Sequence, residues 1–274
     1  MATGTETDPG TRAVPRRVRR WSWVVVLVVG IVLFELVRRT LVATGNPNFV
    51  PSLILLGAAV VPATFLTFVA GRSLPTDLGA APLAVTALLG GVLGTVVAGT
   101  LEYDTLQRIG GVPMLLVAVI EEAAKLIVPA ALILVPRYRA GPANGLVLGV
   151  ASGAGFAALE TMGYAVTVLI ESRGALGAVD GILLVRGLLS PAAHMAWTGL
   201  TASALWRAAE QRGHPGALAR FLGVFVVAVA LHTAWDSLGG LVVYAVLAAI
   251  AFLLLILTTR RLSHLALARE AAPA

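Results

Sequence analysis

Long apolar stretches, separated by short segments rich in glycine, proline and charged residues, run through almost the whole chain. Most of them are about 20 residues long, which is the length that an α-helix needs to cross about 30 Å of hydrocarbon. We place eight such spans, at residues 21–37, 50–70, 82–99, 113–135, 144–170, 182–208, 217–236 and 239–259. The pattern therefore predicts an all-α fold, a polytopic transmembrane helical bundle of about eight spans.

Arginines gather in every second segment between the predicted spans. With the N-terminus in the cytoplasm, fourteen arginines lie in cytoplasmic segments. Those that lie on the other side are Arg38, Arg39, Arg108 and Arg173. Because positive charge accumulates on the cytoplasmic side of membrane proteins, this asymmetry predicts that both termini are cytoplasmic.

The two ends of the chain are more polar than its middle. Four arginines close the first 20 residues, and no small-residue cleavage site follows the apolar run behind them, so we interpret that run as an uncleaved span and not as a signal peptide. We expect a disordered basic cytosolic tail at 1–20, a single transmembrane domain at 21–260 and a second cytosolic tail at 261–274.

The composition agrees with a membrane protein. Of the 274 residues 58% are hydrophobic and 12% are charged, whereas about a quarter are charged in an ordinary soluble domain. The net charge of +6 follows from the cytoplasmic arginines, so we expect the lipid bilayer as a partner and no nucleic acid. The absence of cysteine excludes disulfides, thiol nucleophiles and cysteine-ligated zinc.

Glycines recur at four-residue spacing in two of the predicted spans. They are Gly90 and Gly94 in one span and Gly145, Gly149 and Gly153 in another. This spacing places small residues on one helix face, where they let membrane helices approach closely. We expect these glycines to serve packing in a tight bundle.

Few ionisable residues remain inside the predicted spans, where each is costly unless it is paired or hydrated. Apart from Arg207 and Arg220, which are counted with the cytoplasmic segments at the ends of their spans, they are Glu35, Glu121, Glu122, Lys125, Glu160, Arg186, His194, His232 and Asp236. Counted from the outer end of each span, Glu122 and Glu160 lie about 13 Å and about 15 Å deep at 1.5 Å per residue. On the same count His194 lies about 18 Å and His232 about 6–9 Å deep. Four helices thus place polar groups in the outer half of the membrane, which predicts one shared site.

Local spacing supports such a site. Glu121 and Glu122 lie four and three residues before Lys125, so the lysine can reach both carboxylates on one helix face. Two adjacent carboxylates cannot both ionise cheaply, so the pair favours a raised pKa or a bound cation. His232 and Asp236 are also four residues apart, which lets the aspartate orient the imidazole or bind a metal itself.

Two imidazoles with neighbouring carboxylates suit Zn²⁺, which keeps an open coordination position in catalytic sites. The four carboxylates of the cluster exceed the one lysine by three negative charges, and a bound cation offsets part of that excess. A further carboxylate beside such a site can act as a general base toward water. The sequence thus predicts a divalent metal, Zn²⁺, and hydrolytic chemistry, with His214 and His264 uninvolved because they lie in polar cytoplasmic segments.

Several other functions are open to a membrane protein with buried charges. The chain has no His-Glu-x-x-His and no Gly-x-Gly-Asp, and Ser152 with His232 is the remaining candidate for a serine dyad of the rhomboid kind. A proton- or ion-coupled transporter also uses buried Glu, His and Asp, but no inverted repeat is apparent and the polar residues gather in one half. The third alternative is a non-enzymatic membrane scaffold.

Four motifs in order resemble the PrsW family of intramembrane proteases, which is similar to the wider superfamily of CAAX prenyl proteases and bacteriocin-processing enzymes. The motifs are Glu121-Glu122-x-x-Lys125, Phe156-x-x-x-Glu160 followed by Tyr164, Arg186 with Pro191 and His194, and His232-x-x-x-Asp236. They cover about residues 110–240. The prenyl-protease branch has histidine where this chain has Glu160, which disfavours prenyl-cysteine substrates.

The resemblance implies a multi-pass protein of the bacterial plasma membrane that acts as a metal-dependent peptidase. The founding member of the family is implicated in extracytoplasmic cleavage of an anti-sigma factor, so the implied substrate is a membrane protein. The resulting hypothesis divides the cluster into a catalytic and a metal-binding set, although either glutamate of the pair can be the base. The catalytic set is Glu121, Glu122 and Lys125, and the metal set is Glu160, His194, His232 and Asp236.

Overall fold

The computed structural model describes residues 16–72, 74, 76, 78–139, 141–211, 214 and 216–271. In this part of the chain every regular element is helical, as predicted. The elements are α1 (Arg16–Thr44), η1 (Pro47–Phe49), α2 (Val50–Ala70), α3 (Ala80–Ile109), α4 (Met114–Lys125), α5 (Ile127–Leu132), η2 (Pro136–Tyr138), α6 (Gly141–Glu171), α7 (Leu176–Glu210), α8 (Ala217–Leu238) and α9 (Leu241–Ala271).

Six helical segments of the described chain are long and apolar enough to cross a membrane. They contain α2, α3, α6, α7, α8 and α9. The prediction of a multi-pass helical membrane protein is therefore confirmed. The number of about eight spans and the cytoplasmic position of both termini stay predictions.

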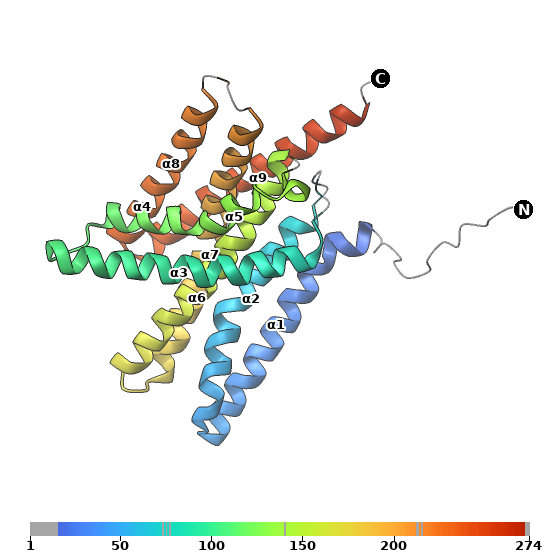
Figure 1. The fold of residues 1–274 in the computed structure, drawn as a ribbon. Helices are drawn as coiled ribbons and strands as arrows, with labels where there is room; N and C mark the ends of the chain where they lie inside the picture. Colours follow the sequence, from blue (N-terminus) through green and yellow to red (C-terminus); the bar gives the residue numbers. More distant parts are fainter. Residues whose placement is uncertain are drawn as a thin grey trace, which may run out of the picture.

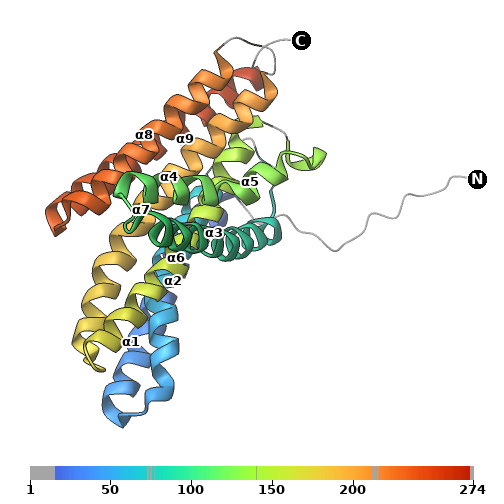
Figure 2. The ribbon, with the colours of Figure 1, turned by 60° about the vertical axis from the view of Figure 1, so that its left-hand side comes forward.

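Helix α6 forms the centre of the bundle. Of its 18-residue apolar window 72% is buried, whereas the corresponding share in the other five segments is 22–33%. Helix α7 packs along α6, and Figures 1 and 2 show α1 and α2 beside one end of this pair and α8 and α9 beside the other. Helix α3 crosses α6, and α4 packs against α3 and α8 and also contacts α6, so the middle of α6 is covered from several directions.

Glycines bring α6 into backbone contact with both α3 and α7. A Cβ added at Gly145 or Gly153 would lie 2.7 Å from a backbone carbonyl oxygen of α7. A Cβ added at Gly90 on α3 would lie 2.8 Å from the Cα of Ser152 on α6. The packing role predicted for the spaced glycines is therefore confirmed, and it fixes the positions of the polar residues on the same helices.

The expectation of one continuous span at 113–135 is wrong. Helix α4 ends at Lys125, and α5 is a separate helix of six residues. Proline at position 129 explains the break, because it has no N–H to donate to the carbonyl of Lys125 four residues earlier. The hydroxyl of Ser152 on α6 donates to that carbonyl instead, at 2.7 Å. The helix break thus fixes the motif-bearing end of α4 against α6.

The terminal helices extend beyond the predicted transmembrane domain of 21–260. Helix α1 begins at Arg16, inside the segment expected to be a tail, and residues 1–15 lie outside the described residues. Helix α9 continues to Ala271, through most of the tail expected at 261–274. The first and last helices are therefore longer than the membrane spans predicted for them.

Candidate metal and active site

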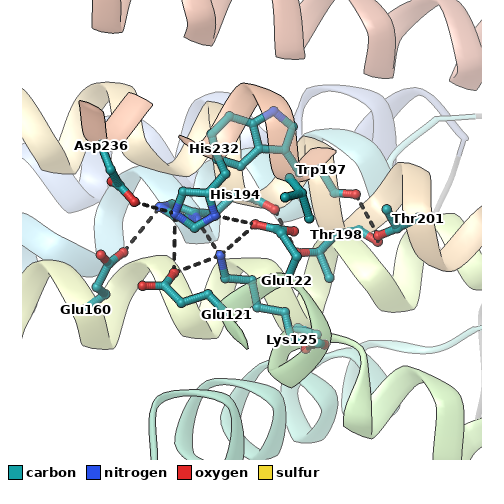
Figure 3. Close-up of polar contacts among 12 residues, drawn as sticks. Glu121, Glu122, Lys125, Glu160, His194, Trp197, Thr198, Thr201, His232 and Asp236 are labelled. Atoms are coloured by element: carbon teal, nitrogen blue, oxygen red, sulfur yellow. Dashed lines mark hydrogen bonds and ion pairs between the residues drawn. The ribbon is translucent and has the colours of Figure 1, made fainter. Parts of the chain in front are cut away.

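The polar residues singled out from the sequence, except Glu35, meet in one cluster. Four helices contribute to it, and Figure 3 shows their side chains pointing toward one another. Helix α4 supplies Glu121, Glu122 and Lys125, α6 supplies Glu160, α7 supplies His194, and α8 supplies His232 and Asp236. Residues more than 110 positions apart in sequence therefore share one buried site.

Lys125 lies at the centre of the cluster and is fully buried. Its Nζ donates to Glu122 Oε1 at 2.9 Å and lies 3.1 Å from Glu121 Oε2. The same Nζ lies 2.7 Å from His194 Nδ1 and 4.3 Å from the ring centroid of Phe156. One ammonium group thus links the paired glutamates of α4 to the histidine of α7.

His232 is oriented by Glu122. Its Nδ1 lies 2.8 Å from Glu122 Oε1, and because a carboxylate only accepts, the imidazole donates its Nδ1–H. Nε2 then presents a lone pair toward Asp236 Oδ2 at 3.3 Å and Glu121 Oε2 at 3.5 Å. Glu122, and not Asp236, therefore orients the His232 imidazole. On the other side of the ring, the electron-rich atoms His232 Nε2, Glu121 Oε2 and Asp236 Oδ2 face one another.

His194 faces a second carboxylate. Its Nε2 lies 3.2 Å from Glu160 Oε2, and both atoms are buried without a hydrogen-bond partner among the described residues. The other oxygen of Glu160 lies 2.7 Å from Arg186 Nη2, and the guanidinium of Arg186 stacks over the ring of Tyr164 at 3.9 Å. Arg186 and Tyr164 thus hold Glu160 in place while one carboxylate oxygen stays available.

The donor set fits a divalent metal ion. Glu121, His194 and His232 each offer one ligand atom, and these atoms lie within 4.8 Å of one another. Two imidazoles and a carboxylate are the ligands that zinc prefers when no thiolate is present. With neutral histidines, the cluster holds four carboxylates against two cationic groups, a net charge of −2, which a divalent ion would balance. The four are Glu121, Glu122, Glu160 and Asp236, and the two are Lys125 and Arg186.

Exposure is graded across the cluster. The side chains of Glu122 and Lys125 are 0% exposed, whereas those of Glu160 and Asp236 are 17% and 23% exposed. One edge of the site, between α6 and α8, is therefore accessible while its interior is sealed. A molecule that enters at this edge would meet the two outer carboxylates first.

Two participants were missed by the sequence reasoning. Trp197 is 1% exposed, and its ring stacks on His232 at 5.1 Å between centroids and packs edge-on against His194 at 5.4 Å. Glu102 on α3 interacts electrostatically with Glu160 and has a buried oxygen without a partner among the described residues. Trp197 follows His194 by one helical turn, which was a usable signal, whereas Glu102 lay beyond the predicted end of its span.

Ser152 has a structural partner, which argues against the serine dyad. Its hydroxyl is fully buried and donates to the Lys125 carbonyl, and it forms no hydrogen bond with either histidine among the described residues. Ser152 lies four residues before Phe156 and eight before Glu160, so the three residues share one face of α6.

We expect Ser152→Ala to lower the free energy of unfolding by about 1–3 kcal/mol, because a buried carbonyl loses its donor. Ser190→Ala is the matched control, since the buried Ser190 hydroxyl has no partner among the described residues and its loss should change little. Denaturation of both variants in detergent checks this. Equal effects would mean that the Ser152 bond does not matter for α4.

Comparison with known proteins identifies the family to which this chain belongs. The model of the PrsW family intramembrane metalloproteases matches residues 78–259, more than half of the chain and all seven cluster residues from the sequence prediction. The chain belongs to the PrsW family. No curated protein and no solved structure matched it.

Membership in the PrsW family confirms the resemblance found in the motifs. The protein is an intramembrane metalloprotease, a multi-pass membrane enzyme that hydrolyses peptide bonds and uses a divalent metal ion. The compact donor set of Glu121, His194 and His232 lies within the matched segment.

Proposed function

We propose that this PrsW protein cleaves a membrane-protein substrate, such as an anti-sigma factor, near the extracytoplasmic side of the bacterial plasma membrane. The observation that carries the proposal is the buried convergence of Glu121, His194 and His232 from three helices. The predicted depth of these residues, in the outer half of their spans, supports cleavage near the extracytoplasmic face.

We assign the metal-holding role to His194, His232 and Glu121, because their ligand atoms are the ones that lie within 4.8 Å of one another. Zn²⁺ is the ion that suits this donor set. When bound, it would polarise the scissile carbonyl and lower the pKa of water. The sequence predicted Glu160 and Asp236 as ligands too. Glu160 lies at His194 Nε2 and Asp236 lies at His232 Nε2, so each can bind the metal as a further ligand or transfer a proton.

The remaining residues would position the histidines and handle the proton. Glu122 holds the proton on His232 Nδ1, and Lys125 balances the charge of the paired glutamates beside His194. Glu160, whose Oε2 is free of hydrogen bonds among the described residues, would accept a proton from the attacking water and return it to the leaving amine. Arg186 would keep that carboxylate aimed at the site.

Substrate would reach the site from the lipid, through the partly exposed edge at Glu160 and Asp236. A helical substrate hides its amides in intrahelical hydrogen bonds, so a segment must unwind before its carbonyl can enter. The expected partners are therefore the bilayer and a membrane protein, without nucleic acid.

The proposal can be tested by identifying new N-termini. The purified enzyme is reconstituted into liposomes with detergent-extracted bacterial membrane proteins, and N-termini are labelled and identified by mass spectrometry. We expect cleavages in or beside apolar spans with the wild type, reduced at least about 100-fold in Glu121→Gln. Glu35→Gln is the matched control, because Glu35 pairs only with Arg38 and Arg39 among the described residues, away from the cluster.

Two other functions would give different results. A scaffold would yield no new N-termini with either protein, and a coupled transporter would show ion flux that Glu121→Gln removes. The geometry favours neither, because the buried ionisable residues of the described chain form one compact cluster and not a path from one side to the other.

A further inference from the structure

A cavity lies between α7, α8 and α9. Its volume is about 540 Å³, and most of its walls are aliphatic side chains such as Val224, Leu231 and Leu254. Trp197, which also packs against the two histidines of the active site, lines it as well. The cavity is therefore separate from the proteolytic cluster but shares one wall with it.

The polar residues of this cavity gather at one end. Arg207, Arg220 and Arg261 come from three different helices and line the same cavity. None of them forms an ion pair with another residue in the described part of the chain. The three guanidinium groups give this end of the cavity a positive potential, which attracts an anion.

A polar hollow of about 330 Å³ adjoins the arginine end and shares Gln211, Ala217 and Arg220 with the larger cavity. His214 also lines it. The side-chain oxygen of Gln211 is buried and has no hydrogen-bond partner among the described residues. An occupant of this end would therefore combine negative charge with a hydrogen-bond donor.

The distance from the arginine end to Trp197 matches one leaflet of a membrane. Arg207 lies ten residues after Trp197 on α7, a separation of about 15 Å along the helix. Half of a hydrocarbon core of about 30 Å is the same length. An apolar cleft of this length with a basic end has the form of a site for one lipid chain and its anionic headgroup.

We propose that this cavity binds one anionic phospholipid of the leaflet at the arginine end. Its phosphate would lie among Arg207, Arg220 and Arg261, since guanidinium groups bind phosphate through paired hydrogen bonds. A hydroxyl of the headgroup would donate to Gln211, which favours phosphatidylglycerol. One acyl chain would extend along α8 and α9 toward Trp197 and pack behind His232.

The test is native mass spectrometry of the detergent-purified full chain with phosphatidylglycerol, phosphatidylcholine or glycerol phosphate as the probe. We expect the wild type to retain phosphatidylglycerol at least about ten-fold more than either of the others. Arg261→Gln should weaken that binding about ten-fold, as loss of a charge-assisted hydrogen bond does. Arg260→Gln is the matched control, because the adjacent arginine on the same helix lines a different cavity, between α2 and α9.

A second variant tests the apolar part of the site. Val224→Trp fills the cleft without changing charge, and it should also weaken retention of phosphatidylglycerol. A thermal unfolding curve verifies that each variant is folded. Equal binding of phosphatidylcholine, binding of glycerol phosphate as strong as that of the lipid, or equal losses in Arg261→Gln and Arg260→Gln would each overturn the proposal. None of these results depends on proteolysis.

Discussion

Replacing His194 or His232 by alanine is expected to remove bound metal and to abolish peptide-bond cleavage. Each imidazole belongs to the compact donor set with Glu121. Four-ligand zinc sites bind with about 10–16 kcal/mol, so the loss of one ligand should weaken binding roughly a hundred-fold or more. Glu122→Gln should have a smaller effect, about 10–100-fold, because Glu122 orients His232 without belonging to the donor set.

Metal content of the purified protein, measured by mass spectrometry after buffer exchange without a strong chelator, checks this prediction. His214→Ala and His264→Ala are matched controls, since both histidines are exposed and distant from the cluster in the predicted cytoplasmic segments. Near-stoichiometric zinc in the wild type and the controls, lost in the two active-site variants, is the expected pattern. A folded, active wild type without metal would contradict it and would favour hydrolysis by Glu121 and His194 acting directly on water.

The meeting of distant residues in one site could be predicted from the sequence. Buried charge is costly in a membrane, so ionisable residues at similar predicted depth had a physical reason to converge, and the structure brings them together. The pairing of Lys125 with both glutamates followed from helical spacing alone. The glycine contacts of α6 with α3 and α7 followed from the same periodicity.

The division of roles within the site could not be predicted, because it depends on which side of each imidazole meets which carboxylate. Spacing suggested that Asp236 orients His232, since the two share a helix. In the structure Glu122 on α4 lies 2.8 Å from His232 Nδ1, whereas Asp236 lies 3.3 Å from the other ring nitrogen, Nε2. The break before α5 was within reach of the sequence, because Pro129 cannot continue the hydrogen-bond ladder. The span was predicted from its apolar residues alone, and Pro129 lies within that apolar run, so the break was missed.

Lys125→Met is expected to destabilise the protein by about 3–5 kcal/mol, the cost of leaving a buried charge without its partner. Lys125 and Glu122 are both 0% exposed at the side chain, so water cannot replace the lost ammonium. The double variant Lys125→Met/Glu122→Gln should recover part of the stability, because only Glu121 then lacks the ammonium, while the glutamine oxygen still accepts from His232 Nδ1. Chemical unfolding in detergent of the wild type, both single variants and the double variant measures this coupling.

The Glu35 and Arg38 pair provides the control, because it has the same three-residue helical spacing in a partly exposed setting. Arg38→Met should change the unfolding free energy little, since exposed ion pairs are weak and water solvates the carboxylate that remains. If Lys125→Met changed the unfolding free energy as little as Arg38→Met, the ammonium would not be compensating buried charge. The net negative charge of the cluster, which favours a divalent ion, would then have to be revised.

If the double variant were folded but still cleaved its substrate, the positioning role of Glu122 and Lys125 would also be wrong. Recovery of stability without recovery of cleavage is the combination that separates folding from catalysis at this site.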